Sequence, residues 1–233
     1  MEVFAFFVGG ILPYITVVLF IFGMGYRFYV WAKTPQPGRM TLFPAPDSLA
    51  GGVLAESLFF PSLFKGDKIL WLFAWIFHAT LALVFLGHIR VFTALIDRML
   101  LAFGMNPEGI DVMSATAGGV AGVLLLTTGL LLLVRRISVR RVRDISGIPD
   151  FSVMILLIAI IVTGDLMRFG THFDLEQTRV WTVSLLTFSP IVPPNGGFIL
   201  HAFLAMILII YIPYSKILHF GGIFFTQALV RRR

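Results

Sequence analysis

The chain has 233 residues, of which 58% are hydrophobic, and its mean hydropathy is +0.93. Soluble domains are usually about 45–50% apolar, so the composition excludes an ordinary soluble domain. There is no cysteine, which excludes disulfides, thiolate-bound Fe–S clusters and covalently attached c-type haem. The net charge of +6 comes from basic residues in short segments between apolar stretches, where membrane topology explains them better than a nucleic-acid partner.

Five apolar stretches are long enough to cross the core of a bilayer, which needs about 20 residues per helix. They cover approximately residues 3–31, 69–95, 112–134, 151–169 and 198–222. The first is too long for a signal peptide and lacks a small-residue cleavage site, so we interpret it as a retained helix. The sequence therefore predicts an all-α fold, a single integral membrane domain of five transmembrane helices.

The charges of the connecting segments predict the orientation. Only four of the eighteen basic residues lie on one side: Arg90, Arg98, Arg168 and Arg179. The other basic residues, which include those of the run "RRISVRR" and of the terminal "RRR", lie on the opposite side. The positive-inside rule places the N-terminus outside and the C-terminus in the cytoplasm.

Two connecting segments are long. Residues 32–68 include "KTPQPGRMTLFPAPDSLAGG", which is rich in Pro and Gly and predicts an irregular cytoplasmic segment. It is either a solvated connector or a platform for a cytoplasmic subunit. The outer segment 170–197 includes "EQTRVWTVSLLTFSP", which favours a short helix along the membrane surface.

Four of the five histidines fall within two of the expected spans. His78 and His88 interrupt "IFHATLALVFLGHIR" in the second span, and the fifth span carries His201 and His219. Ionisable groups inside a bilayer are rare and usually functional, although a histidine can also simply bond a neighbouring helix. These two spans are antiparallel, so His78 is level with His219 and His88 with His201. Separations of about 15 Å and 27 Å leave a depth mismatch of roughly 4–8 Å between partners.

Histidine pairs at two depths favour haem over zinc. Zinc requires four clustered ligands, whereas a b-type haem takes one axial histidine on each face. We therefore expect two bis-histidine b-type haems and an electron-transfer function. A proton-relay transporter and a cofactor-free membrane anchor are the alternatives.

Neighbouring residues have two interpretations each. The stretch "SATAGGVAG" places Gly118 and Gly122 four residues apart, which favours close helix packing and also leaves room for a flat cofactor. Arg90 follows His88 by two residues, where it either binds a haem propionate or extends to the membrane interface.

The sequence resembles the respiratory nitrate reductase gamma-subunit family, the five-helix dihaem cytochromes b. The resemblance rests on "FHATLALVFLGH", "AGGVAGVLLLTTGLLLLVRR" and "LHAFLAMILIIYIPYSKILH", which fill all four ligand positions of the family. It implies the pairing of His78 with His219 and of His88 with His201. It also implies a multi-pass protein of the prokaryotic cytoplasmic membrane that belongs to a respiratory chain.

Two sequence segments, "GDKILWLFAWIFH" and "SKILHFGGIFF", are more similar to one branch of that family than to the rest of it. Its members are cytochrome b subunits of membrane complexes in sulfur metabolism, associated with sulfite reductase or with multihaem cytochromes c. The similarity implies a cytoplasmic Fe–S partner of the heterodisulfide-reductase type. The loop 96–111 has no lysine where nitrate reductase has one implicated in quinol binding, so that site does not carry over intact.

A haem chain across a membrane implies menaquinone or another quinone at its outer end, with a proton-exchanging group nearby. His172 is the outer-face histidine, and an ordinary histidine titrates in the required range. Asp165 and Arg168 are three residues apart at the end of the fourth span, and Glu108 and Asp111 are further candidates. Each of them has the alternative of being a solvated interface charge. The direction of electron flow stays open.

Overall fold

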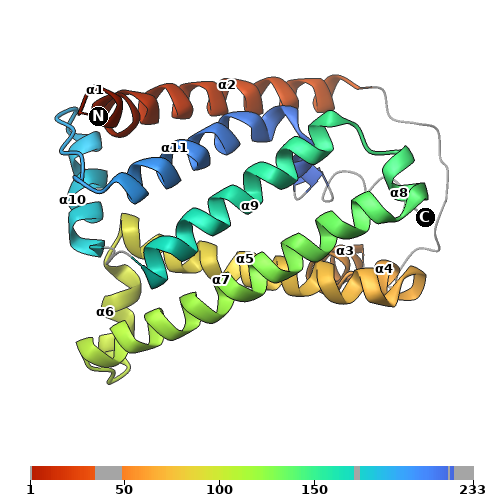
Figure 1. The fold of residues 1–233 in the computed structure, drawn as a ribbon, viewed down its shortest axis with the longest axis horizontal. Coiled ribbons are helices and arrows are strands. Elements are labelled where there is room, and N and C mark those ends of the chain that lie inside the picture. The colour runs from red at the N-terminus through yellow and green to blue at the C-terminus, as the bar shows by residue number, and fades with distance from the viewer. Residues whose placement is uncertain (1, 35–48, 171–173, 220, 223–233) are drawn as a thin grey trace.

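The computed structural model describes residues 2–34, 49–170, 174–219 and 221–222 (Figure 1). Every regular element in these residues is a helix. Five helices are long and apolar enough to cross a membrane: Glu2–Lys33, Lys68–Phe92, Pro107–Ser138, Ile148–Phe169 and Gly196–Tyr214. The expected all-α fold with five membrane spans is confirmed.

The first span is continuous but not uniform. It begins as α1 (Glu2–Phe6), passes through one π-helical turn, η1 (Phe7–Ile11), and continues as α2 (Leu12–Lys33). At the π turn the Gly9 carbonyl accepts a hydrogen bond of 2.7 Å from the indole of Trp181. A Cβ atom at Gly9 would lie 2.5 Å from the side chain of Val192. Glycine therefore allows the segment before the fifth span to pack against the first span.

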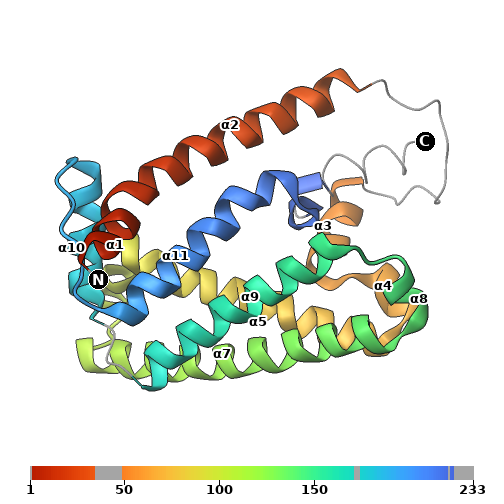
Figure 2. The same ribbon diagram turned by 45° about the horizontal axis from the view of Figure 1, so that its top comes forward.

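The remaining spans are α5 (Lys68–Phe92), α7 (Pro107–Ser138), α9 (Ile148–Phe169) and α11 (Gly196–Tyr211). They pack in the order α2, α11, α9, α7, α5, so that each helix contacts the next (Figures 1 and 2). In the described residues α5, which carries His78 and His88, and α11, which carries His201, are not close packing neighbours. The fold therefore holds α5 and α11 apart through α9 and α7.

The short helices gather at the two ends of the bundle (Figure 1). At one end lie α6 (Leu95–Ala102) and α10 (Leu175–Leu186), and at the other lie α3 (Leu49–Phe59), α4 (Pro61–Gly66) and α8 (Arg140–Asp144). Helix α10 confirms that residues 170–197 contain a short helix, as expected. Of the stretch expected to be irregular, residues 33–52, positions 35–48 lie outside the described residues, and the expectation was wrong for residues 49–52, which begin α3. Pro61 begins α4, where its missing N–H costs no helical hydrogen bond.

The fifth span departs from the continuous helix expected over 198–222. Helix α11 ends at Tyr211 and is followed by two short 3₁₀ turns, η2 (Ile212–Tyr214) and η3 (Lys216–Leu218). Pro213 has no N–H to continue the α-helix, and Ser215 has an extended backbone. The chain therefore changes direction before it reaches His219, which a depth calculated from one straight helix could not take into account.

A buried apolar cluster joins α2 and η1 to α9 and α11. It consists of Val8, Leu12, Met167, Phe198, Ile199, Ala202 and Met206. Most other large apolar side chains of the spans point outward, as lipid-facing residues do in a membrane protein.

Candidate functional site: two histidine pairs

The four membrane histidines form two facing pairs, in the crossed arrangement that antiparallel helices predict. The rings of His78 and His219 have their centroids 5.9 Å apart, and those of His88 and His201 are 6.2 Å apart. We call His78 and His219 the inner pair, and His88 and His201 the outer pair, after the sides that the charge pattern predicts. Tertiary structure thus brings together side chains more than 100 positions apart in the sequence.

The spacing within each pair fits one metal ion between two imidazoles. A metal–nitrogen distance of about 2 Å and a ring radius of about 1 Å on each side place the two centroids roughly 6 Å apart. Both pairs have this separation. Each pair presents two imidazoles, and among the described residues no third potential metal ligand joins them.

The hydrogen bonds of the four rings use Nδ1 and leave Nε2 available to bind a metal ion. In every case Nδ1 lies near a backbone carbonyl: Ala74 for His78 at 2.7 Å, Val84 for His88 at 2.7 Å, Ile160 for His201 at 3.1 Å and Lys216 for His219 at 2.9 Å. A carbonyl can only accept, so Nδ1 carries the proton and Nε2 keeps its lone pair. Orientation through the second ring nitrogen is the usual arrangement of a metal-bound histidine.

The two pairs differ in the relative orientation of their rings. The ring planes of the inner pair are nearly perpendicular, at 86°, while those of the outer pair are nearly parallel, at 17°. The edge of the Phe60 ring also contacts His78, with centroids 5.3 Å apart. Phe60 has a left-handed backbone, with φ of 51°, at the junction of α3 and α4. A residue at the junction of α3 and α4 therefore covers one member of the inner pair.

Contacts from the first and fourth spans fix the turn that presents His219. Arg27 of α2 donates a hydrogen bond of 2.6 Å to the Pro213 carbonyl. A Cβ atom at Gly23 would lie 2.8 Å from the Pro213 ring, so α2 approaches this bend closely. Lys216 pairs with Asp150 at the start of α9, at 2.8 Å. The inner pair thus depends on a non-helical segment held by two other helices.

The fourth span also holds His201. The Thr163 hydroxyl lies 3.0 Å from Nδ1 of His201, beside the Ile160 carbonyl. A Cβ atom at Gly164 would lie 3.3 Å from Cε1 of His201, so the backbone of α9 abuts the ring. His201 is therefore positioned by α9, a different helix from the one that carries it.

Arg90, expected from the sequence to bind a haem propionate or extend to the membrane interface, takes part in a network of ion pairs. Its guanidinium pairs with Asp97 of α6 at 2.5 Å and with Asp111 of α7 at 3.4 Å. Arg179 of α10 pairs with the other oxygen of Asp97 at 2.5 Å and donates to the Arg90 carbonyl. Burial acts to raise the pKa of Asp97, but hydrogen bonds and charge from Arg179 and Arg90 outweigh burial and hold that pKa below its usual value. The network joins four helices just beyond His88.

The small residues of α7 pack against α9. A Cβ atom at Gly118 would lie 3.0 Å from the Arg168 guanidinium, and one at Gly122 would overlap the Asp165 carboxylate. The two sequence candidates Asp165 and Arg168 thus share the face of α9 that meets α7. Oδ2 of Asp165 is buried and has no hydrogen-bond partner among the described residues. The packing interpretation of the glycines agrees with these contacts.

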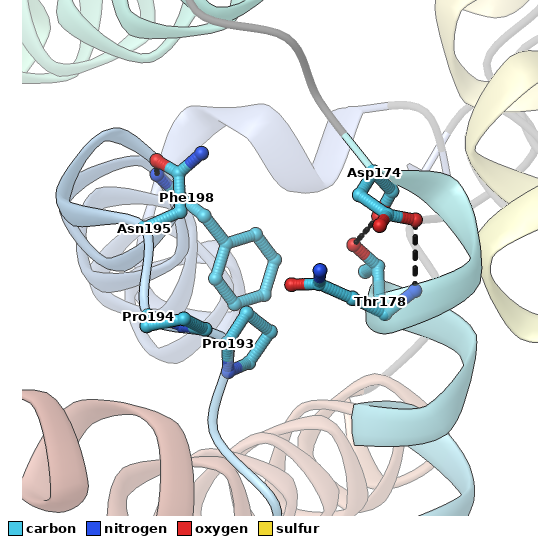
Figure 3. Close-up of a pocket in the computed structure, with 7 residues that line it drawn as sticks. Asp174, Thr178, Pro193, Pro194, Asn195 and Phe198 are labelled. Carbon is cyan, nitrogen blue, oxygen red and sulfur yellow. Dashed lines mark hydrogen bonds between the residues drawn. The ribbon is translucent and has the colours of Figure 1, made fainter.

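The other quinone-site candidates are not gathered around one hollow. His172 lies outside the described residues, and Glu108 is exposed in the first turn of α7. A hollow of about 200 Å³ lies between α10 and the start of α11, and Figure 3 shows Pro193, Asn195 and Phe198 on one side of it. The carboxylate of Asp174 in its wall caps α10 and accepts hydrogen bonds from backbone N–H groups. Asp165, Arg168 and Glu108 do not line this hollow.

Sequence reasoning missed Thr163, Asp97 and Arg179. A threonine in an apolar span carries no sign of which helix it faces, and its hydroxyl commonly bonds its own helix. Asp97 and Arg179 lie in separate connecting segments, and only the tertiary fold brings them to Arg90. The sequence placed Asp97 and Arg179 on the same side of the membrane, but it did not indicate that they form ion pairs with each other or with Arg90.

Fold and site together define a polytopic membrane protein with two facing histidine pairs at different depths. Residues 61–232 match the family model described as the nitrate reductase gamma subunit, and the chain belongs to this family. It is thus an electron-transport membrane protein of the cytochrome b type, multi-pass in the prokaryotic cytoplasmic membrane.

Two curated relatives cover most of the chain. It is 32% identical to the Hdr-like menaquinol oxidoreductase cytochrome b-like subunit of Archaeoglobus fulgidus, over 94% of this chain and 77% of the relative. It is 28% identical to the respiratory nitrate reductase 2 gamma chain of Escherichia coli, over 66% of this chain and 71% of the relative.

Proposed function

We propose that the chain transfers electrons between a quinone on the outer side and a cytoplasmic Fe–S partner through two bis-histidine b-type haems. The observation that carries the proposal is the pair of facing imidazoles, repeated at two depths with centroids 5.9 Å and 6.2 Å apart. In both pairs the nitrogens available for iron are the Nε2 atoms. When bound, the haems supply two one-electron carriers separated along the membrane normal.

The protein's own contribution is to place the ligands. The outer pair holds one haem between α5 and α11, and the inner pair holds the other. His78 and His88 are ten residues apart on one helix, which corresponds to a rise of about 15 Å. Helices α5 and α11 are not close packing neighbours in the described residues, and the apolar spans that carry the pairs are an environment that suits haem.

For the quinone, the Archaeoglobus fulgidus relative, which is named as a menaquinol oxidoreductase subunit, supports menaquinol or a similar quinol as substrate. Asp165 is the best placed proton acceptor, since its Oδ2 atom has no hydrogen-bond partner among the described residues, and Arg168 is one helical turn away on the same face. His172 and Glu108 are the other candidates. When a quinol is oxidised, its two protons leave on the outer side and its two electrons pass inward, one at a time, through the haems.

The cytoplasmic partner is proposed to be an Fe–S subunit of the heterodisulfide-reductase type, in a complex that could also contain a multihaem cytochrome c and serve sulfur metabolism. The name of the Archaeoglobus fulgidus relative, which begins with "Hdr-like", supports the Fe–S subunit of this type. Contact between Phe60 and His78 supports electron transfer at the face that carries α3 and α4.

The test is haem quantification on the purified chain in mild detergent, by pyridine haemochrome assay and reduced-minus-oxidised spectrum. We expect two b-type haems per chain. The variants His88→Ala and His201→Ala should lose the same haem, and His78→Ala and His219→Ala should lose the other. A folded wild-type chain without haem would overturn the proposal and favour a proton relay or a cofactor-free anchor.

The quinone site is tested separately with Asp165→Asn. This variant should retain both haems and oxidise a quinol analogue more slowly. Oxidation at an unchanged rate would remove Asp165 from the site without affecting the haem assignment.

A further inference from the structure

Among the four paired histidines, His201 is held differently from the others. The Nδ1 atoms of the other three lie against carbonyls three or four residues earlier in their own segments. His201 instead meets two groups of α9, the Thr163 hydroxyl at 3.0 Å and the Ile160 carbonyl at 3.1 Å. The orientation of this ring is therefore set by a helix that carries no histidine of either pair.

The direction of the Thr163 hydrogen bond follows from the ring. If Nε2 of His201 binds iron, Nδ1 must carry the proton, so the Thr163 oxygen accepts. The hydroxyl proton of Thr163 has its own acceptors, because the Ala159 and Ile160 carbonyls lie 3.0 Å and 2.9 Å from its oxygen. In this arrangement Nδ1–H of His201 and the Thr163 hydroxyl both have acceptors. The His201 tautomer is the one that is protonated on Nδ1 and leaves Nε2 available to iron.

An acceptor on Nδ1 makes an imidazole a stronger donor to its metal. Stronger donation stabilises ferric over ferrous iron and so lowers the reduction potential. The contact also restrains rotation of the ring, since the α9 backbone at Gly164 closes its Cε1 side. These two effects act on the outer pair alone.

We propose, resting on the two-haem function above, that Thr163 is a positioning residue for His201 and sets the reduction potential of the outer haem without affecting the inner one. Its hydroxyl is the adjustable part of the contact, because the Ile160 carbonyl belongs to the backbone and is retained in any variant.

The experiment is a potentiometric titration of the purified chain, followed by the visible absorption of the b-type haems. Thr163→Val removes the hydroxyl at nearly constant volume, and Thr163→Ser keeps it. Thr128→Val on α7 is the control, since the Thr128 hydroxyl is buried and bonds the Leu124 and Leu125 carbonyls of its own helix. The outer haem is identified as the one whose transition disappears in His88→Ala.

In Thr163→Val we expect the outer potential to rise while the inner potential stays unchanged. Because the Ile160 carbonyl remains as acceptor, the reduction equilibrium constant should change by no more than about tenfold, which is about 59 mV for one electron. Thr163→Ser should restore the wild-type value, and Thr128→Val should leave both potentials in place. Loss of the outer haem alone from Thr163→Val would also support the proposal, because the ligand has then lost its orientation.

Unchanged potentials in Thr163→Val, equal shifts of both haems, or a serine variant that behaves like the valine variant would overturn the proposal. The electron paramagnetic resonance signal of the oxidised outer haem gives a second readout, since it responds to the orientation of His201. A wild-type chain without haem would overturn the proposed function instead, so the two failures are distinguishable.

Discussion

The ion-pair network beyond His88 yields a quantitative prediction for Asp97→Asn. The side chains of Arg90, Asp97 and Arg179 are only 10%, 17% and 21% exposed, and each oxygen of Asp97 lies 2.5 Å from a guanidinium nitrogen. A hydrogen bond to a charged group contributes about 1.5–3 kcal/mol, and removing one partner of a buried ion pair costs about 3–5 kcal/mol. Asparagine keeps one acceptor oxygen, so we expect the free energy of unfolding to fall by about 3 kcal/mol.

The control is Asp144→Asn, which removes the same charge from an exposed pair. Asp144 and Arg140 are 61% and 87% exposed and their closest atoms are 3.8 Å apart. This loss should be no more than about 0.5 kcal/mol. Unfolding would be followed by circular dichroism in mixed micelles of rising denaturing-detergent content. Equal destabilisation by the two variants would refute the claim that burial gives the network its strength.

The same network predicts how stability depends on pH. The pKa of Asp97 is lower in the folded protein than the usual value near 3.9 for an unfolded chain. Its contribution is therefore fully present above about pH 4 and is lost as the pH falls through the lowered folded pKa. The destabilisation by Asp97→Asn, measured against wild type, should shrink in that acidic range. A constant difference down to the lowest pH would contradict the assignment.

Three further predictions concern packing and the haem sites. Gly122→Leu should destabilise the protein by about 1–3 kcal/mol in the same detergent titration, because its side chain overlaps Asp165, whereas Gly25→Leu, with nothing within 4 Å of its Cβ position, should be nearly neutral. Phe60→Gly should be more stable than Phe60→Ala by about 1 kcal/mol, since only glycine adopts the left-handed backbone without cost; equal midpoints would argue against strain there. The oxidised protein should give two different low-spin signals in electron paramagnetic resonance. The nearly parallel rings of the outer pair split the iron d orbitals strongly, whereas the perpendicular rings of the inner pair leave them nearly degenerate. Two identical signals would refute the difference in ring angle.

The sequence by itself determined the number of spans and the identity of the paired histidines. A bilayer admits essentially one solution for an apolar stretch of about 20 residues, the helix, so composition and length decide the fold class. Antiparallel helices then fix which histidines are level with each other. For the same reason, four ionisable side chains within lipid indicated a function before any contact was known.

The tertiary structure decided everything that depends on which face of one helix meets which face of another. The bend at Pro213 and Ser215 redirects the chain before His219, and a hydropathy pattern does not register it because the residues remain apolar. Thr163 meets His201 only because α9 lies beside α11, and their positions differ by 38 residues. Arg90, Asp97 and Arg179 come from three segments whose pairing the charge pattern left open. Local chemistry therefore fixed the elements and the ligands, while the packing of helices fixed how each ligand is held.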